Sequence, residues 1–226
     1  HIKSKWYGQC SYQEALNIQL QKEKQVRSTG LHWVLGFEHP TVVTLGRRGS
    51  SAQDIKTRSE DLCAQNIDVV SIWRGGEATL HSPGQLVIYP ILDLRRLHLG
   101  VKDYMSLLIG TTHEWFKGFG LNTSFSLKNP GLYTNKGKIA FFGIRVNRGV
   151  TSHGVSININ NDLELFSHIR SCGKDLENFD RLGHYIFDCN ERQFFVTWLE
   201  IFQGQLSQVC ESFQAFMQPS GDKMGL

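Results

Sequence analysis

Residues 137–163 read GKIAFFGIRVNRGVTSHGVSININNDL and show a clear strand pattern. It contains two runs, 138–146 and 151–160, that are rich in the β-branched and aromatic residues typical of strands. Asn147-Arg148-Gly149 lies between them and Asn135-Lys136-Gly137 comes just before. Both are turn signals, because Asn and Gly tolerate positive φ. Residues 131–134 lead into the first turn as a further strand, so the pattern predicts an antiparallel β-meander in the middle third of the chain.

Strand and helix patterns follow one another irregularly outside this meander. Apolar runs bounded by Gly or Pro predict further strands at 32–37, 41–45, 69–73 and 85–92. Three long helices are predicted: one opened by the capping box Ser11-x-x-Glu14 and running to about residue 25, one at 102–120 and one at 192–209. Shorter helices are expected around Cys63 and at 162–169. Strands in runs with inserted helices indicate an α+β domain rather than strict βαβ alternation. A single domain, 1–226, accommodates the whole length.

Composition and charge exclude several classes of protein. The chain is 40% hydrophobic and 20% charged, with a net charge of +3 and scattered Lys and Arg. A nucleic-acid binder usually concentrates a stronger basic bias on one face, so we expect no nucleic-acid partner. No apolar run reaches the length of a membrane span, and the N-terminal residues lack the apolar stretch of a signal peptide. We therefore expect no membrane partner.

The five cysteines stand at positions 10, 63, 172, 189 and 210. Their number is odd and no two have C-x-x-C spacing, which argues against a disulfide framework and a zinc ribbon and favours a reducing cytoplasm. Free cysteines are usually packing residues. Cys63 falls in an expected helix and Cys210 at the end of another, as packing residues would. Cys172 follows an expected short helix at 162–169 and precedes Gly173, so its loop context makes it the best nucleophile candidate.

Two further segments carry chemistry that a plain core strand does not need. Residues 74–85, RGGEATLHSPGQ, follow an expected strand with paired glycines bracketed by Arg74 and His81. Paired glycines let the backbone approach a ligand closely, although an ordinary glycine-rich hairpin is the alternative. Lys138 begins an expected strand. A lysine at this position is often solvated, and the alternative is that it supplies a point charge beside a buried site.

Common catalytic signatures are missing from the sequence. Gly131 to Gly137-Lys138 has five intervening residues rather than the four of a phosphate-binding loop, and Ile139 follows the Lys where Ser or Thr is required. G-x-S-x-G, H-E-x-x-H and G-x-G-x-x-G do not occur, and no pair among the nine histidines has metal-ligand spacing. Covalent catalysis without a cofactor or a metal remains.

Four stretches together resemble the lipoyl(octanoyl) transferase family of lipoate biosynthesis. They are HPTVVTLGRRG (39–49), RGGEATLHSPGQLVIYPI (74–91), GKIAFFGIRVNRGVTSHGVSININNDL (137–163) and SCGKDL (171–176), in the family's order. The resemblance implies the fold of the biotin and lipoate protein ligases, a mixed and largely antiparallel sheet flanked by helices. It also implies a monomeric, cytoplasmic acyltransferase of one catalytic domain, 1–226.

The resemblance implies a reaction and the residues that carry it out. Octanoyl-acyl carrier protein donates its acyl group to Cys172, and the acyl-thioester is then attacked by a lysine of a lipoyl domain, as in 2-oxo-acid dehydrogenases or the glycine cleavage H protein. Lys138 is the catalytic partner of Cys172. The acyl-binding residues map onto three segments: Arg74, Gly75, Gly76, Glu77, Ala78, Thr79, Leu80 and His81; Phe141, Phe142 and Gly143; Gly154, Val155 and Ser156.

Physical chemistry supports this pairing. A thiolate attacks a thioester, and a free thiol with a pKa of about 8.5 is little ionised at neutral pH, so a nearby ammonium favours the reactive form. We expect Lys138 to supply that charge and later to take the proton of the incoming amine. His81 could orient the carbonyl or assist proton transfer.

The sequence departs from the family pattern at three positions. Ser171 replaces the usual Pro before the cysteine, Ser82 replaces the first Gly of H-G-P-G-Q, and Glu77 stands where Gln is common. Two alternative functions remain open. One is an ATP-dependent lipoate or biotin ligase, whose H-D-x-G-N pattern differs from residues 81–85 here; the other is a non-catalytic module that binds acyl carriers or lipoyl domains.

Overall fold

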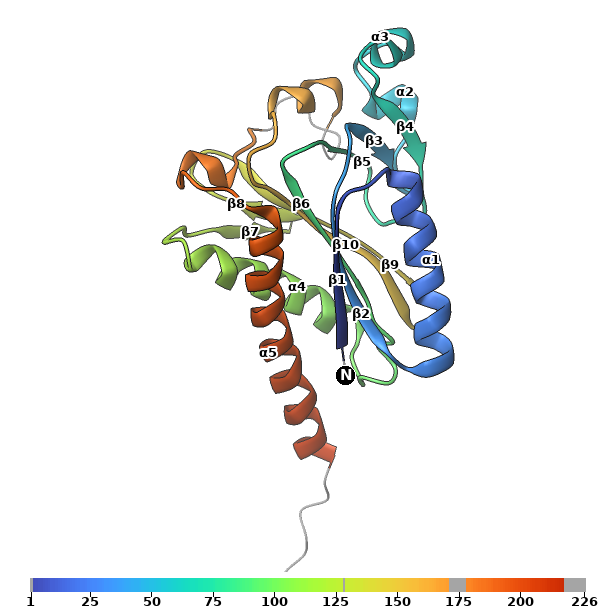
Figure 1. Ribbon diagram of the computed structural model, residues 1–226, viewed down its shortest axis with the longest axis vertical. Helices are drawn as coiled ribbons and strands as arrows, with labels where there is room; N and C mark the ends of the chain where they lie inside the picture. The colour runs from blue at the N-terminus through green and yellow to red at the C-terminus, as the bar shows by residue number, and fades with distance from the viewer. Residues whose placement is uncertain (1, 128, 171–177, 218–226) are drawn as a thin grey trace, which may run out of the picture.

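The computed structural model describes residues 2–127, 129–170 and 178–217, with side chains described up to residue 212. Seven strands form the main sheet in the order β1-β2-β6-β10-β9-β8-β7 (Figure 1). Within these ranges β1 and β2 pair in parallel and all other neighbours in this sheet pair antiparallel. Their bounds are β1 Ile2–Gln9, β2 His32–Glu38, β6 Gln85–Ile91, β7 Ser124–Ser126, β8 Gly131–Tyr133, β9 Lys138–Asn147 and β10 Val150–Asn158.

The expected β-meander is confirmed as β8, β9 and β10. The turn between β9 and β10 has positive φ at both central residues, 51° at Arg148 and 87° at Gly149. This is the backbone that a two-residue hairpin loop needs, because its twist matches that of the strands. The hairpin fixes the register, so that Gly143 on β9 lies directly opposite Gly154 on β10.

Two layers of helix cover the main sheet. Helix α1, Tyr12–Thr29, packs against β2, β6 and β10, whereas α5, Glu191–Met217, packs against β1, β2, β6 and α4, Val101–Lys117. Figure 1 shows α1 on one side of the sheet and α4 with α5 on the other. Helix α1 begins with the expected capping box of Ser11 and Glu14. Helix α5 continues to Met217, beyond the expected end at 209, so Cys210 lies within it.

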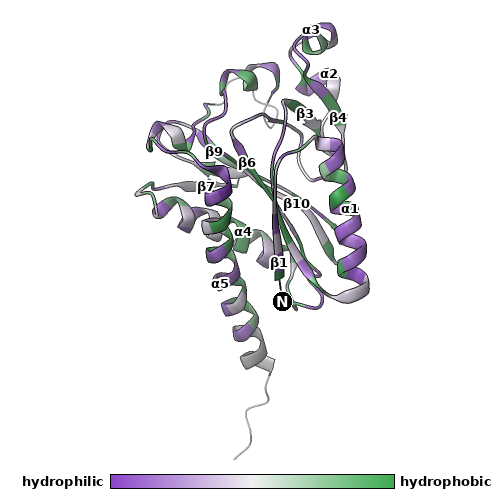
Figure 2. Ribbon diagram, in the orientation of Figure 1, coloured by the Kyte–Doolittle hydropathy of each residue, from purple (hydrophilic) through white to green (hydrophobic). Residues whose placement is uncertain are grey.

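The core follows the alternation of the strands. Val155, Ile157 and Ile159 pack with Trp115 of α4 and Trp198 of α5 in the larger cluster. Each fully buried side chain of this size contributes roughly 1.5–3 kcal/mol through the hydrophobic effect. Figure 2 shows hydrophilic and hydrophobic stretches alternating along α1 and α5.

A second sheet of three strands, β4-β3-β5, lies at one end of the main sheet (Figure 1). Its strands are β3 Val42–Leu45, β4 Asp68–Ser71 and β5 Ala78–His81, with short helices α2 Ser51–Asp54, α3 Ser59–Ala64 and η1 Glu164–His168 nearby. The strand expected at 69–73 ends at Ser71, and Trp73 is 71% exposed. Cys63 lies in a helix as expected but is exposed, so the packing role expected for it is wrong.

The remaining described element is η2, Leu182–His184. None of the helices within the described ranges is both long enough and apolar enough to cross a membrane.

Candidate active site

A cavity of about 250 Å³ lies where the small sheet meets β9 and β10 of the main sheet. Its wall is mostly apolar, with a few polar and charged groups. The lining residues are Tyr12, Arg48, Arg74, Gly75, Gly76, Glu77, Ala78, Thr79, His81, Val87, Tyr89, Met105, Pro130, Lys138, Phe141, Phe142, Gly143, Ile144, His153, Gly154, Val155 and Ser156. A concave, largely apolar space with few polar groups is the usual form of a small-molecule site.

The floor of the cavity is bare because two glycines face each other across β9 and β10. Gly143 and Gly154 form a cross-strand pair. A Cβ on Gly154 would lie 2.3 Å from the carbonyl oxygen of Ile88, so only glycine allows β6 to approach so closely. A Cβ on Gly143 would lie 3.3 Å from Cδ of Arg74, so this glycine also lets the 74–77 loop settle over the sheet.

Arg74 holds the glycine-rich loop in place over this floor. Its guanidinium donates to the Thr44 carbonyl at 2.7 Å, to Thr44 Oγ1 at 2.9 and 3.2 Å, and to the Gly75 carbonyl at 2.9 Å. The loop is also tied to β9, because the Gly75 N–H donates to the Ile144 carbonyl at 3.0 Å. Gly46 completes the packing, since a Cβ there would lie 2.4 Å from the Gly76 carbonyl oxygen.

Lys138 is almost completely buried, with 1% of its surface exposed, so it is not a solvated strand end. Its side chain runs past Gly131, where a Cβ would lie 2.4 Å from Lys138 Cε. Nζ donates to Asn129 Oδ1 at 3.4 Å and lies 5.0 Å from the ring centre of Phe141 and 5.7 Å from that of Tyr133. An amine at the cavity wall lies where it can act on a reacting group.

The backbone of Lys138 is fixed by the segment that begins at residue 178. Its N–H donates to the Asn178 carbonyl at 2.8 Å, and its carbonyl accepts from the Asp180 N–H at 2.9 Å. On the other side of residues 171–177, the Arg170 N–H donates to the Asp54 carbonyl at 2.7 Å. Cys172, the expected nucleophile, lies outside the described residues.

Three histidines and two tyrosines form a buried polar cluster at one wall of the cavity. His81 stacks on Tyr12 with ring centres 5.7 Å apart, and His39 Nε2 lies 3.1 Å from the hydroxyl of Tyr89. Burial lowers the pKa of His39 to about 4 and that of His153 to about 3, and it holds the pKa of His81 well below its usual value. At neutral pH all three rings are therefore uncharged.

The comparisons with known proteins agree with this geometry. Residues 9–182 match the family described as the lipoyl protein ligase A/B catalytic domain. Relatives named octanoyltransferase include one of Desulfovibrio desulfuricans, 36% identical over 74% of this chain and 70% of the relative, and one of Hahella chejuensis, 31% identical over 88% and 83%. The chain belongs to this family, among its octanoyltransferases. An octanoyltransferase of Desulfotalea psychrophila is 46% identical, over 60% of this chain and 61% of the relative.

Solved structures confirm the fold expected for the octanoyltransferase family. A putative lipoate protein ligase of T. acidophilum with bound lipoic acid superposes with a TM-score of 0.70 at 10% identity, over 94% of this chain and 93% of that one. A biotin protein ligase of Aquifex aeolicus in complex with biotin and ATP gives a TM-score of 0.56 at 15% identity, over 92% and 72%. The α+β class, with a mixed sheet flanked by helices, is therefore confirmed.

Almost all of the acyl-binding residues that the family resemblance implied line this one cavity. They come from three separate segments, residues 74–81, 141–143 and 154–156, which the small sheet and the β9–β10 hairpin bring together. Leu80 does not line the cavity; its side chain is fully buried in the core of the small sheet. That position follows from strand alternation, since Thr79 and His81 on either side face the cavity.

Several lining residues were missed from the sequence. Tyr12 at the start of α1 carried no local signal, because only the packing of α1 across the sheet brings it to His81. Val87 and Tyr89 share a face of β6 with Gln85, so period-two alternation from the glycine-rich segment could have found them. His153 next to Gly154 was a detectable signal, since a histidine inside an apolar strand needs a reason to be there.

Proposed function

We propose that this octanoyltransferase works in two steps through an acyl-thioester on Cys172, with Lys138 as the group that controls protons and charge. The burial of Lys138 at the cavity wall supports this proposal most strongly. A lysine is rarely buried without a functional or structural reason. Here the residue lines the largely apolar cavity, and its backbone N–H donates a hydrogen bond to the carbonyl of Asn178, which follows residues 171–177.

In the first step the Cys172 thiolate attacks the carbonyl carbon of octanoyl-acyl carrier protein. The new C–S bond forms as the C–S bond to the carrier breaks, and the carrier thiolate leaves as a thiol by taking a proton from the Lys138 ammonium, which becomes neutral. One thioester replaces another, so the step is nearly balanced in energy and needs no ATP. A cationic Lys138 would favour the thiolate over the thiol.

In the second step the side-chain amine of a lipoyl-domain lysine attacks the acyl-cysteine. A C–N bond forms, the C–S bond breaks, and Cys172 is released as the thiolate. The amine loses a proton, for which Lys138 is the proposed acceptor. Replacing a thioester by an amide makes the sequence of steps energetically downhill.

The proposed acyl site is the groove over Gly143 and Gly154, covered by residues 74–77. The ring of Phe141 would contact the chain there, because Phe141 shares a face of β9 with Gly143. Burial of an alkyl chain contributes about 0.8 kcal/mol per methylene, enough to select a medium-chain group. We also propose that residues 1–226 act as one catalytic domain and as a monomer, in the cytoplasm.

An assay with alternative donors separates this function from ATP-dependent ligation. The protein is incubated with a lipoyl domain and either octanoyl-carrier thioester alone or free octanoate with ATP. We expect octanoylation of the lipoyl-domain lysine with the thioester and none with octanoate and ATP. Efficient transfer from free octanoate would support a ligase instead, and transfer from neither donor would favour a non-catalytic binding module.

A further inference from the structure

A chain of buried hydrogen bonds leads from His81 at the cavity into the sheet. The Gln85 amide nitrogen donates to the Leu80 carbonyl at 3.2 Å and to Asn158 Oδ1 at 2.9 Å. The Gln85 amide oxygen lies 3.0 Å from His81 Nδ1. Gln85 and Asn158 have no exposed surface and His81 is 5% exposed, so water does not replace these bonds.

The partners of Gln85 fix which way its amide points. A backbone carbonyl only accepts hydrogen bonds, so the atom of Gln85 next to the Leu80 carbonyl is the nitrogen. The same argument applies to Asn158, whose amide nitrogen donates to the Asp180 carbonyl at 3.0 Å and whose oxygen therefore faces Gln85. The Gln85 oxygen is left for His81, and it requires Nδ1 to carry the proton.

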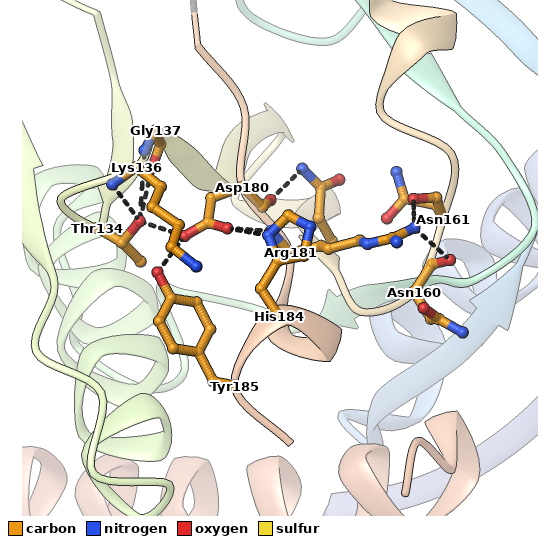
Figure 3. Close-up of polar contacts among 10 residues, drawn as sticks. Thr134, Lys136, Gly137, Asn160, Asn161, Asp180, Arg181, His184 and Tyr185 are labelled. Atoms are coloured by element: carbon orange, nitrogen blue, oxygen red, sulfur yellow. Dashed lines mark hydrogen bonds and ion pairs between the residues drawn. The ribbon is translucent and has the colours of Figure 1, made fainter. Parts of the chain in front are cut away.

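The far end of this chain is itself anchored by a buried carboxylate. Asp180 has no exposed surface and accepts hydrogen bonds from the hydroxyls of Thr134 and Tyr185, from His184 Nδ1 at 2.7 Å and from the Arg181 N–H at 2.9 Å (Figure 3). The bond from the Tyr185 hydroxyl measures 2.6 Å. These bonds hold the Asp180 backbone still, and with it the acceptor that orients Asn158.

The other ring nitrogen of His81 is then an acceptor on a ring that lines the cavity. Burial keeps the pKa of His81 well below its usual value, helped by the neighbouring His39. The ring is therefore neutral, and with Nδ1 protonated its Nε2 carries a lone pair. Nε2 has no hydrogen-bond partner among the described residues.

We propose that Gln85 is a positioning residue that holds His81 as the Nδ1–H tautomer, so that His81 Nε2 accepts a hydrogen bond from the attacking amine of the acceptor lysine. This role rests on the proposed function, because it assigns His81 to the second step. An acceptor at this point orients the nitrogen lone pair toward the acyl carbon. The other neutral tautomer, with the proton on Nε2, would present a donor to the amine and misalign the amine.

The tautomer is measured directly by NMR on protein labelled with ¹⁵N-histidine. The His81 resonances are assigned as those that disappear in His81→Gln. We expect Nδ1 to be protonated and Nε2 to be unprotonated between about pH 6 and about pH 8. His39 is an internal control: its Nδ1 lies 2.8 Å from the Cys10 carbonyl, which fixes the same tautomer by a separate bond.

Two variants distinguish positioning from general support of the fold. Gln85→Met removes the acceptor, and we expect mixed tautomers at His81 and a loss of roughly tenfold in the rate of transfer from acyl-enzyme to lipoyl domain. Acylation by the carrier thioester should change much less. Asn158→Leu disturbs the same buried chain but leaves the Leu80 carbonyl to orient Gln85, so it should keep the Nδ1–H tautomer.

The outcomes that overturn the inference are separate from those that overturn the function. A wild-type His81 protonated at Nε2 refutes the inference even if Gln85→Met does not fold. Equal tautomers and equal second-step rates in wild type and Gln85→Met refute it as well. A wild-type protein that forms no acyl adduct, yet shows the expected tautomer, contradicts the proposed two-step function and leaves the tautomer assignment standing.

Discussion

The position of the Lys138 amine depends on one missing side chain, that of Gly131 on the neighbouring strand. A Cβ at residue 131 would lie 2.4 Å from Lys138 Cε and 2.8 Å from the Ala140 carbonyl oxygen. Real Cβ atoms do not approach other atoms so closely, so the lysine side chain or the strand has to move. Small displacements of a catalytic group reduce rates strongly.

Gly131→Ala should therefore impair catalysis more than folding. We expect acyl transfer to fall about 100-fold and the free energy of unfolding to fall by about 1–3 kcal/mol, as overpacking of a core does. Steady-state kinetics and urea unfolding measure the two effects. Gly204→Ala is the matched control: it lies in α5 with no atom within 4 Å of the new Cβ. If both variants keep full activity, the position of Lys138 is not critical.

A second prediction at the scale of the residue concerns the buried histidines and the loss of stability at acidic pH. His39 has a pKa of about 4 in the folded protein against an ordinary value of 6.5. Between these values the unfolded chain binds a proton that the folded chain does not, so stability is complete above about pH 6.5 and falls as the pH drops toward 4. The total for His39 is roughly 3 kcal/mol, at 1.36 kcal/mol per pKa unit.

Urea unfolding at several pH values tests this sign. We expect the free energy of unfolding of the wild type to fall steadily from pH 6.5 to pH 4.5. His39→Asn should be less stable at pH 7 but should show a shallower fall over the same range, since one of the protonating groups is gone. Parallel curves for the two proteins would mean that His39 is not buried in the neutral form.

At the scale of the element, the side chain of Arg74 adds to the backbone hydrogen bonds that hold the 74–77 loop over the cavity. The Arg74 guanidinium reaches both Thr44 on β3 and the Gly75 carbonyl, and so joins the small sheet to the loop. Its planar array of donors makes this possible, and the single ammonium of lysine does not span the same acceptors.

Arg74→Lys should loosen the cover of the acyl groove. We expect the KM for the octanoyl donor to rise about tenfold, equal to the loss of about 1.4 kcal/mol from hydrogen bonds to a charged group, with a smaller change in kcat. Arg58→Lys is the control, because Arg58 forms an exposed pair with Asp61 and does not line the cavity. An unchanged KM in Arg74→Lys would show that the loop is held by other contacts.

The helices and strands differ in how clearly the sequence predicts them. The β9–β10 hairpin and α1 were predictable, because Asn147-Arg148-Gly149 specifies its turn and Ser11 with Glu14 specifies a helix start. Strand β1 was not predicted. It is a half-exposed edge strand, its hydrophobic pattern is weak, and its pairing with β2 is a long-range contact that no local pattern encodes.

At the scale of the whole molecule, the site exists because topology joins distant segments. The order β6-β10-β9 brings residues 85–91 beside 150–158 and 138–147, and the small sheet carries residues 74–81 over them. The sequence predicted these segments as chemically unusual and, through the family resemblance, as parts of one site. The sequence did not predict how these segments come together, or that Tyr12 and His153 line the cavity, because the packing of helices on the sheet determines both.

Intact-mass spectrometry can show whether the octanoyl group passes through Cys172. The protein is incubated with octanoyl-carrier thioester without a lipoyl domain, and its mass is measured before and after. We expect a gain of one octanoyl group in the wild type, the loss of that adduct after addition of lipoyl domain, and no adduct in Cys172→Ala. An adduct that persists in Cys172→Ala would contradict this expectation.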